Sequence, residues 1–309
     1  MSIISRSVDD CSGETVTTGL PTEIECAVSV LVFTLNEELN LEHCLGSLEW
    51  CDDVVVVDSF STDRTIEVCA GRNVRSVPHE FRGFGDQRNW ALREIPLKHE
   101  WVLILDADER VSPELALELS ILGESAPRRI GAYRVRRRFH LWGRWLRHSS
   151  LYPTWVVRFV KQGRVRYVNR GHSETQEVDG DIGELAGHLI DENHKPLSAW
   201  LERQCRYAYQ EAAFELAEEE SMAAFGDLFS RDPMRRRSTI KRLASGVPFR
   251  AFFYFVYCYF FRMGFLDGRN GFAFCRMKAI YQSMIAVNKH EIRMRNLAAE
   301  NERERHENE

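Results

Sequence analysis

Two carboxylates at the end of an apolar run are the strongest chemical feature of this sequence. Asp106-Ala107-Asp108 closes Trp101–Asp106 (WVLILD), which has the composition of a buried strand. Ligands of open α/β sheets bind outside the carboxyl ends of the strands. Two carboxylates there can share one hard divalent cation that keeps open positions for phosphate oxygens. We therefore expect a metal and a phosphate-bearing substrate at this point; the alternative is that Asp108 only begins a turn and caps the next helix.

Polar segments also follow two other apolar runs, at 27–34 and 53–58. TLNEE (34–38) comes after the first run, and DSFSTD (58–63) comes after the second. Their carboxylates and hydroxyls can accept hydrogen bonds from a base and from ribose, while Asn36 and Thr62 are also expected to cap helices. In FGDQRN (84–89), glycine permits a close approach and the following side chains can reach a base or a diphosphate. The residues expected to contact substrate are Thr34, Asn36, Glu37, Asp58, Gln87, Arg88, Asn89 and Asp106.

A doubly wound α/β sheet would bring these segments together. Strands are predicted at 27–34, 53–58, 73–77 and 101–106, and helices at 61–71, 85–93 and from Asn36 and Pro113 onward. The sequence has neither a GxGxxG nor a GxxxxGK[ST] loop, so neither a dinucleotide-binding Rossmann domain nor a P-loop is indicated. Further along, a hairpin of 155–160 with 165–168 and a long helix at 196–216 are expected.

A basic region follows the predicted sheet. Residues 125–173 contain thirteen lysines and arginines and no aspartate or glutamate, although the whole chain has a formal net charge of -5. Within 134–148, arginines alternate with aromatic residues, among them Arg137 and Trp145. Guanidinium groups bind phosphate bidentately and aromatic faces stack on sugars, which suits a phosphorylated glycolipid acceptor. The alternatives are a solvated basic face and a nucleic-acid patch, and the acidic net charge disfavours the second.

Four segments occur together in the order and spacing of a known family. They are TLNEELNLEHCLGSL (34–48), DSFSTDRT (58–65), GDQRNWAL (85–92) and DADER (106–110). With them, residues 27–220 resemble family 2 inverting glycosyltransferases, of the bacterial kind that includes lipopolysaccharide core glucosyltransferases. The resemblance implies the GT-A nucleotide-diphospho-sugar transferase fold, a Rossmann-like mixed sheet flanked by helices. It also implies a nucleotide-sugar donor, commonly UDP-linked, with Asp58 near the base and ribose and with Mn or Mg held on the diphosphate by Asp106 and Asp108.

Inversion in one displacement requires a general base to take the proton of the acceptor hydroxyl. GHSE (171–174) lies where such transferases resemble one another in a segment with histidine and glutamate. Glu174 is therefore the predicted base, with His172 as a neighbour or substitute; the alternative is that Glu174 only pairs with an upstream arginine. Asp191 stands where related sequences often have histidine and is predicted as a third metal contact.

Cysteine usage and the terminal segments indicate a cytoplasmic protein. The eight cysteines show no CxxC pair and no zinc spacing, and the N-terminal segment lacks the pattern of a signal peptide. The longest apolar run, Ala251–Phe261, is about half of the roughly 20 residues that a membrane-spanning helix needs. Aromatic residues at 249–265, preceded by Arg235–Arg237, favour an element that lies on anionic lipid at the inner face of the plasma membrane. Packing on the catalytic domain or on a second subunit is the alternative.

The predicted organisation has five parts. They are a flexible lead (1–23), a GT-A catalytic domain (24–222), a basic linker (223–240), an aromatic helical extension (241–290) and a charged tail (291–309). The expected function is transfer of a hexose to a lipid-linked saccharide in lipopolysaccharide or surface polysaccharide biosynthesis. A nucleotidyltransferase would need a glycine-rich, basic loop where TLNE (34–37) stands. A non-catalytic glycan- or lipid-binding protein on a transferase scaffold is the other alternative, and the oligomeric state stays open.

Overall fold

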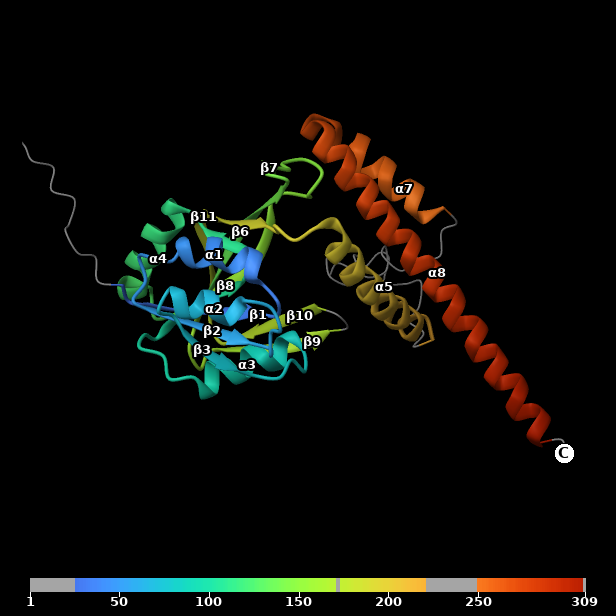
Figure 1. The fold of residues 1–309 in the computed structure, drawn as a ribbon, viewed down its shortest axis with the longest axis horizontal. Coiled ribbons are helices and arrows are strands. Elements are labelled where there is room, and N and C mark those ends of the chain that lie inside the picture. Colours follow the sequence, from blue (N-terminus) through green and yellow to red (C-terminus); the bar gives the residue numbers. More distant parts are fainter. Residues whose placement is uncertain (1–25, 171–172, 221–248, 308–309) are drawn as a thin grey trace, which may run out of the picture.

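A mixed nine-stranded sheet is the centre of the protein (Figure 1). The computed structural model describes residues 26–170, 173–220 and 249–307. The strands are β1 Val28–Thr34, β2 Asp53–Asp58, β3 Arg75–Pro78, β4 Trp101–Asp106, β5 Glu109–Val111, β6 Ile130–Leu141, β7 Arg144–Trp145, β8 Thr154–Lys161, β9 Val165–Arg170, β10 Ser173–Val178 and β11 Asp181–Glu192. Their order in the sheet is β3-β2-β1-β4-β8-β6-β11-β5, with β7 paired to β6, while β9 and β10 form a separate two-stranded sheet.

Helices cover the sheet and form an extension beside it. They are α1 Glu38–Gly46, α2 Thr65–Gly71, α3 Phe84–Glu94, α4 Pro113–Ser125, α5 Leu197–Glu220, α7 Arg250–Val256 and α8 Gly268–Glu307. Between α7 and α8 the chain makes a π-helical turn, η2 Tyr257–Phe261, and a 3-10 turn, η3 Gly264–Asp267. The predicted mixed α/β fold with a C-terminal helical extension is confirmed.

Both faces of the parallel strands β1, β2 and β4 are buried, because successive side chains of a strand point to opposite faces. Val30 and Val32 join one apolar cluster with residues of α1, α2 and α4, whereas Leu31 joins a second cluster with residues of α3 and β9. These two clusters explain why the strands are continuous apolar runs in the sequence. In these three strands the charged residues, Asp53, Asp58 and Asp106, stand only at the strand ends.

The first two helices begin later than predicted. Asn36 has a φ of 55°, in the left-handed region, and α1 begins only at Glu38. Instead of capping α1, the Asn36 Oδ1 accepts a hydrogen bond of 2.7 Å from the Thr62 backbone N–H. Helix α2 begins at Thr65, whose N–H donates to Asp63 at 3.0 Å, so Thr62 is not its cap either. Both expected caps are therefore wrong, because the two loops bind each other.

The predicted hairpin of 155–160 with 165–168 is also wrong. Gly163 does reverse the chain, with a φ of 75°. However, β8 is hydrogen-bonded to β4 on one edge and to β6 on the other, so neither edge is free for β9. β9 pairs with β10 instead, and this small sheet packs on the face covered by α3. Local turn chemistry was correct, and the tertiary pairing decided the partner.

The helical extension is held together by α5 and α8, which lie side by side in Figure 1. Ala208 and Ala212 of α5 pack on Ile285 of α8, and the buried Glu215 pairs with Arg250 at 2.9 Å and Lys289 at 3.3 Å. The predicted lead (1–23) and linker (223–240) lie outside the described residues. No helix in the described ranges has both the length and the apolar character to span a bilayer.

Candidate functional site

Four strands deliver their final residues to one edge of the sheet. β1, β2 and β4 are parallel, with Asp58 opposite Thr34 and Asp106 opposite Phe33. β8 runs antiparallel to β4, β6 runs antiparallel to β8, and β11 runs parallel to β6. β11 therefore has the same direction as β4. Asp191 at the end of β11 therefore lies at this edge as well. The structure thus gathers these predicted residues at one edge of the sheet, where open α/β sheets bind ligands.

Asp106 is held by two buried arginines. Its Oδ1 accepts from Arg88 at 2.7 Å and its Oδ2 from Arg158 at 2.5 Å. Burial alone would raise the pKa of Asp106, but the charges of Arg158 and Arg88 outweigh it and lower that pKa. Arg158 also donates to Glu109 at 2.9 Å, and Glu109 accepts the Asp106 backbone N–H at 3.1 Å. Asp106 is therefore a fixed, ionised carboxylate.

Asp108 lies in a different environment. Within the described residues it makes no ion pair, and its Oδ2 accepts from the Asn193 amide at 3.0 Å. Burial, and then the charges of Asp106 and Glu37, raise its pKa. Glu37 itself is bound by Lys195 at 2.6 Å. Asp108 thus carries the least compensated negative charge of the Asp106-Ala107-Asp108 segment.

Asp191 pairs with Arg137, whose Nε lies 3.3 Å from its Oδ2. Burial is the largest cause that raises the pKa of Asp191 to about 7. The favourable charge of Arg137 opposes it, and the charges of Asp108, Glu109 and Asp106 add to it. Arg137 also approaches Glu109 at 3.5 Å. The basic strand β6 therefore contributes one of its arginines to the acidic edge.

The chemistry of these donors fits a hard divalent cation, because Mn and Mg take carboxylate oxygens in proteins. Asp108 has the uncompensated charge that a cation would neutralise, and Asp106 is close enough to perturb it. Among the described residues, no three histidine, cysteine or acidic side chains are arranged to hold an ion by themselves. The two aspartates thus fit a cation that completes its ligands with substrate phosphate oxygens. Metal binding by Asp106, Asp108 and Asp191 stays a prediction.

Glu174 on β10 is brought to Asp106 through Arg88. The Arg88 Nη1 pairs with Glu174 Oε1, while its Nη2 holds Asp106. The Glu174 Oε2 is buried and has no hydrogen-bond partner within the described part of the chain. Glu174 thus does pair with an arginine, as the structural alternative expected, and it retains one oxygen free to accept a proton. His172 lies outside the described residues.

The residues predicted to contact a nucleotide mainly organise two loops. Asp58 accepts from the Thr34 hydroxyl at 2.8 Å and from the backbone N–H and hydroxyl of Ser61 at 2.8 and 2.5 Å. Gln87 donates to the Ser59 hydroxyl at 2.8 Å. The 58–62 loop is thereby fixed against the end of β1 and the start of α3. It is a preorganised rim, and its contact with a nucleotide stays a prediction.

Two other predicted residues lie apart from the carboxylates. The Asn89 amide donates to the Tyr167 carbonyl at 2.7 Å and accepts the Tyr167 N–H at 2.8 Å, so it bridges α3 to β9. The guanidinium carbon of Arg138 lies over the ring of Trp145 on β7, 4.8 Å from the ring centroid. The Trp145 indole N–H is buried without a partner among the described residues. Asn89 is thus engaged by backbone, whereas Trp145 keeps an unused donor.

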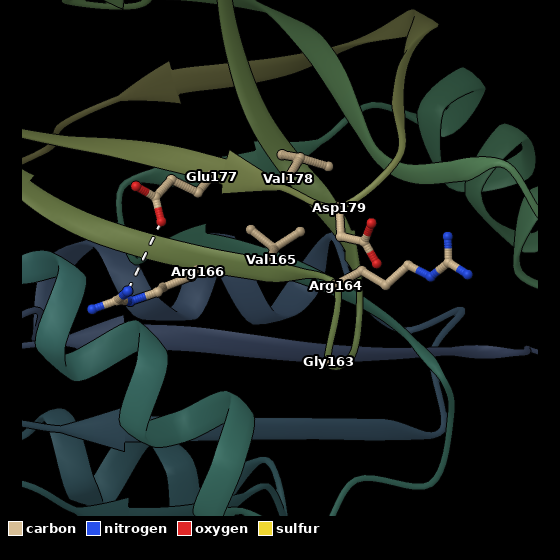
Figure 2. Close-up of a pocket in the computed structure, with 7 residues that line it drawn as sticks. All are labelled: Gly163, Arg164, Val165, Arg166, Glu177, Val178 and Asp179. Carbon is tan, nitrogen blue, oxygen red and sulfur yellow. Dashed lines mark ion pairs between the residues drawn. The ribbon is translucent and has the colours of Figure 1, made fainter.

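The hollow drawn in Figure 2 lies at the end of the β9–β10 pair that is far from Glu174. It has a volume of about 330 Å³ and is lined by Gly163, Arg164, Val165, Arg166, Glu177, Val178 and Asp179. Val178, which lines the hollow, follows Glu174 by four residues along the extended strand β10. The two residues are therefore about 13 Å apart along the strand. Its Arg166–Glu177 pair is exposed, at 4.0 Å, so the hollow is separate from the acidic edge.

Sequence reasoning missed Arg158, Glu109, Asn193 and Lys195. Arg158 had a recognisable signal, because a charged residue inside the apolar strand TWVVRFV (154–160) needs a buried partner. Glu109 is fully buried and supplies that partner. Asn193 and Lys195 follow β11 and reach α1 and the end of β4 only through the fold, so no local pattern marks them.

Comparison with known proteins identifies the family of this mixed α/β domain. Residues 29–186 match the model of Glycosyl transferase family 2, which covers half of the chain. The protein belongs to this family. The match ends within β11 and therefore includes the acidic segment after β4 and the 58–62 loop.

Among its relatives, LpsC, a lipopolysaccharide core biosynthesis glycosyltransferase of Rhizobium meliloti (strain 1021), is 31% identical over 162 residues, which are 50% of this chain and 59% of that protein. An uncharacterized glycosyltransferase of Rickettsia bellii (strain RML369-C) is 32% identical over 111 residues, 35% of this chain and 37% of that protein. The chain thus spans less than two thirds of the length of these relatives.

Solved structures were also compared with the fold. S. aureus TarS 1-349 is 18% identical with a TM-score of 0.38, covering 86% of this chain and 91% of that chain. Glucosyl-3-phosphoglycerate synthase from Mycobacterium tuberculosis, in complex with Mn2+, UDP-glucose and phosphoglyceric acid, is 16% identical with a TM-score of 0.39, covering 61% of this chain and 78% of that chain.

Proposed function

We propose that this protein is an inverting glycosyltransferase that moves a hexose from a nucleotide-diphosphate sugar, with UDP as the nucleotide, to a lipid-linked saccharide. The observation that carries the proposal is the family match over the strands whose ends gather Asp58, Asp106 and Asp108. The similarity to LpsC supports a role in the assembly of lipopolysaccharide or another surface polysaccharide.

The donor binds across the carboxyl edge. Its base and ribose lie on the 58–62 loop, and its diphosphate lies over the acidic end of β4. A Mn or Mg ion held by Asp106 and Asp108 would neutralise charge on the diphosphate when bound. Arg88 and Arg158 keep Asp106 ionised and immobile, so the carboxylate need not reorganise when the donor enters.

The acceptor hydroxyl attacks the anomeric carbon from the side opposite the diphosphate. A new carbon–oxygen bond forms there, the bond from that carbon to the diphosphate breaks, and the hydroxyl proton passes to Glu174. The ion pair with Arg88 fixes one Glu174 oxygen, and the other, which has no partner among the described residues, is the one that accepts. The pairing with Arg88 therefore orients the base.

Arginines and tryptophans on β6–β8 support a phosphorylated glycan acceptor. Arg134 and Arg136 lie 5.0 and 5.5 Å from the Trp155 ring centroid, and Arg138 lies 4.8 Å from that of Trp145. The Nε groups of Arg136 and Arg138 are buried and unpaired within the described chain. Such donors beside aromatic faces suit a sugar that carries phosphate.

Binding to an anionic membrane surface is part of the same proposal. The exposed aromatic residues of α7, of the residue before it, and of η2 and η3 are Phe249, Phe252, Phe253, Tyr257, Phe260, Phe261 and Phe265. Exposed Arg269 and Arg276 at the start of α8 supply charge that complements anionic lipid. This surface would hold the enzyme at the inner face of the plasma membrane, where a lipid-linked acceptor lies.

Vesicle sedimentation tests this part. Phe260→Ser with Phe261→Ser should release the protein from vesicles that contain phosphatidylglycerol. Leu297→Ser, at an exposed position near the far end of α8, should not. Equal sedimentation of both variants and the unchanged protein would contradict membrane docking by this surface.

Donor binding tests the function directly. We expect isothermal titration with UDP, UDP-glucose, GDP-mannose and a dTDP-sugar, each with and without Mn, to show binding of one nucleotide that depends on the metal. Binding of none of them would contradict the proposal and favour a non-catalytic protein on a transferase scaffold.

A further inference from the structure

Two cysteines meet at the edge of the sheet opposite the carboxylates. Cys26 stands two residues before β1, and Cys51 stands two residues before β2. Both sulfur atoms lie within hydrogen-bonding distance of one oxygen, the carbonyl of Val28, at 3.4 and 3.2 Å. The two thiols also form a hydrogen bond with each other. The sulfur atoms therefore lie side by side, and both are free thiols in this structure.

The backbone around this pair is fixed. β1 and β2 are parallel neighbours with Ser29 opposite Asp53, so both cysteines precede the sheet at the same edge. Asp53 is buried and accepts the Ser29 hydroxyl at 2.5 Å and the Lys98 backbone N–H at 2.8 Å. Neighbouring strands lie about 4.8 Å apart, and a disulfide needs Cα atoms about 4.4–6.8 Å apart. The strand starts thus hold the two cysteines at a spacing that a disulfide can bridge.

Cys26 has the environment of a reactive thiol. The hydrogen bond from Cys51 is the largest cause that lowers the pKa of Cys26 to about 6. Burial opposes this shift, and hydrogen bonds from the backbone of Val28 and Asp52 add to it. Cys26 is therefore mostly a thiolate at neutral pH, which is the nucleophilic form. The hydrogen bond to Cys26, followed by burial, raises the pKa of Cys51, which keeps its proton.

Other cysteines of the described chain have different environments. Burial raises the pKa of four of them, which are unreactive packing residues: Cys44, Cys69, Cys258 and Cys275. Cys205 is exposed on α5, in the helical extension. Cys26 and Cys51 are half-buried, so a small oxidant can reach them. This pair thus combines access, a thiolate and a second thiol beside it.

We propose that Cys26 and Cys51 form a peroxide-reactive dithiol that closes into a reversible disulfide. The Cys26 thiolate attacks one oxygen of hydrogen peroxide, the O–O bond breaks, and hydroxide leaves as Cys26 becomes a sulfenic acid. The Cys51 sulfur then attacks the Cys26 sulfur. An S–S bond forms, and the sulfenic hydroxyl leaves with the Cys51 proton as water. The two thiols have then given two electrons to the peroxide, and a dithiol reductant reverses the change.

The disulfide would join the segment that enters β1 to the segment that enters β2. It closes a loop that contains β1 and α1, and a cross-link of this kind stabilises a fold mainly by restricting the unfolded chain. The carboxyl ends of the same two strands carry Thr34 and Asp58. Oxidation would therefore stabilise the strands that support the candidate site without occupying it, so this inference is independent of the sugar transfer proposed above.

Peptide mapping of the full chain tests the pair without any substitution. The protein is treated with hydrogen peroxide, remaining thiols are blocked with iodoacetamide, and the chain is cut after glutamate. This cleavage puts Cys26, Cys44 and Cys51 in the separate peptides 26–37, 43–49 and 50–67. We expect peptides 26–37 and 50–67 to be cross-linked, and dithiothreitol to separate them. Cys26 left unlinked, or joined to a cysteine other than Cys51, would overturn the inference.

Two variants and two further measurements separate this chemistry from general oxidation. Cys51→Ser should abolish the cross-link, whereas Cys205→Ser, which removes an exposed thiol, should retain it. Peroxide should raise Tm by about 5–10 °C in the unchanged protein and leave that of Cys51→Ser unchanged. In the reduced protein, alkylation of Cys26 should become only about twofold faster between pH 6 and pH 8. A rise of about 90-fold, as for an ordinary thiol, or an unchanged Tm on oxidation would contradict the proposal.

Discussion

Replacing Arg88 with methionine is the sharpest perturbation of the site. The Arg88 side chain is 5% exposed and bridges Asp106 and Glu174, which come from β4 and β10. Its guanidinium carbon lies 5.7 to 5.8 Å from the ring centroids of Phe33, Phe84 and Tyr167, so an apolar stem is accommodated there. Methionine therefore removes the charge and preserves most of the packing.

The loss of stability expected for Arg88→Met comes from the two carboxylates, Asp106 and Glu174, that lose this partner. Removing one partner of a buried ion pair costs about 3–5 kcal/mol, because the other charge loses its compensation. Asp106 retains Arg158 at 2.5 Å and is 33% exposed, so it contributes little to the loss of stability. Glu174 is 11% exposed and loses the one ion-pair partner that it has in the described residues. We expect a loss of about 3 kcal/mol in the free energy of unfolding, or about 6–12 °C in Tm.

Urea unfolding followed by circular dichroism measures this loss. Arg82→Met, which breaks an exposed pair with Glu80, should cost less than about 1 kcal/mol and serves as the control. The double variant Arg88→Met with Glu174→Gln should be more stable than Arg88→Met alone, because the uncompensated charge is gone. An Arg88→Met midpoint equal to that of the Arg82 control, with no recovery in the double variant, would refute this electrostatic account.

Three further changes test the supports of the site. Asp267→Asn removes the carboxylate that binds Ser149 and its neighbours; we expect about 2–3 kcal/mol lower stability in urea, and an unchanged midpoint would contradict the anchor. Gly187→Ala would place a Cβ 2.6 Å from the Leu115 Cα, so soluble expression and Tm should both fall, unlike for alanine at the open position Gly71. Asn89→Ala loses both hydrogen bonds to β9 and should lower the free energy of unfolding by about 2 kcal/mol. Amide hydrogen exchange should become faster in β9, and unchanged exchange there would contradict the bridge.

Much of the sheet could be predicted from local patterns. The runs that became β1, β2 and β4 are buried on both faces, so their continuous apolar composition is a direct consequence of their position. The cap and proline at Ser112 and Pro113 likewise start α4 where expected, with the Leu115 N–H donating to Ser112 at 3.3 Å. Asp106 and Asp108 could be predicted because they follow such a run directly.

The interactions that complete the site depend on pairing between distant segments. Asn36 was expected to cap α1, but the loop after β2 takes its side chain, and only the β1–β2 register brings that loop within reach. The partner of Glu174 is Arg88, 86 positions earlier in the numbering, and it meets Glu174 only because α3 packs against the β9–β10 hairpin.

Stereochemistry of donor cleavage tests the central claim most directly. The donor chosen by titration, in its α-linked form, would be incubated with the protein, and the freed sugar would be followed by proton NMR before it mutarotates. We predict that the β-anomer appears first, and that Asp106→Asn and Asp108→Asn each abolish its release. First appearance of the α-anomer, or release that survives both substitutions, would contradict an inverting transferase with its chemistry at this edge.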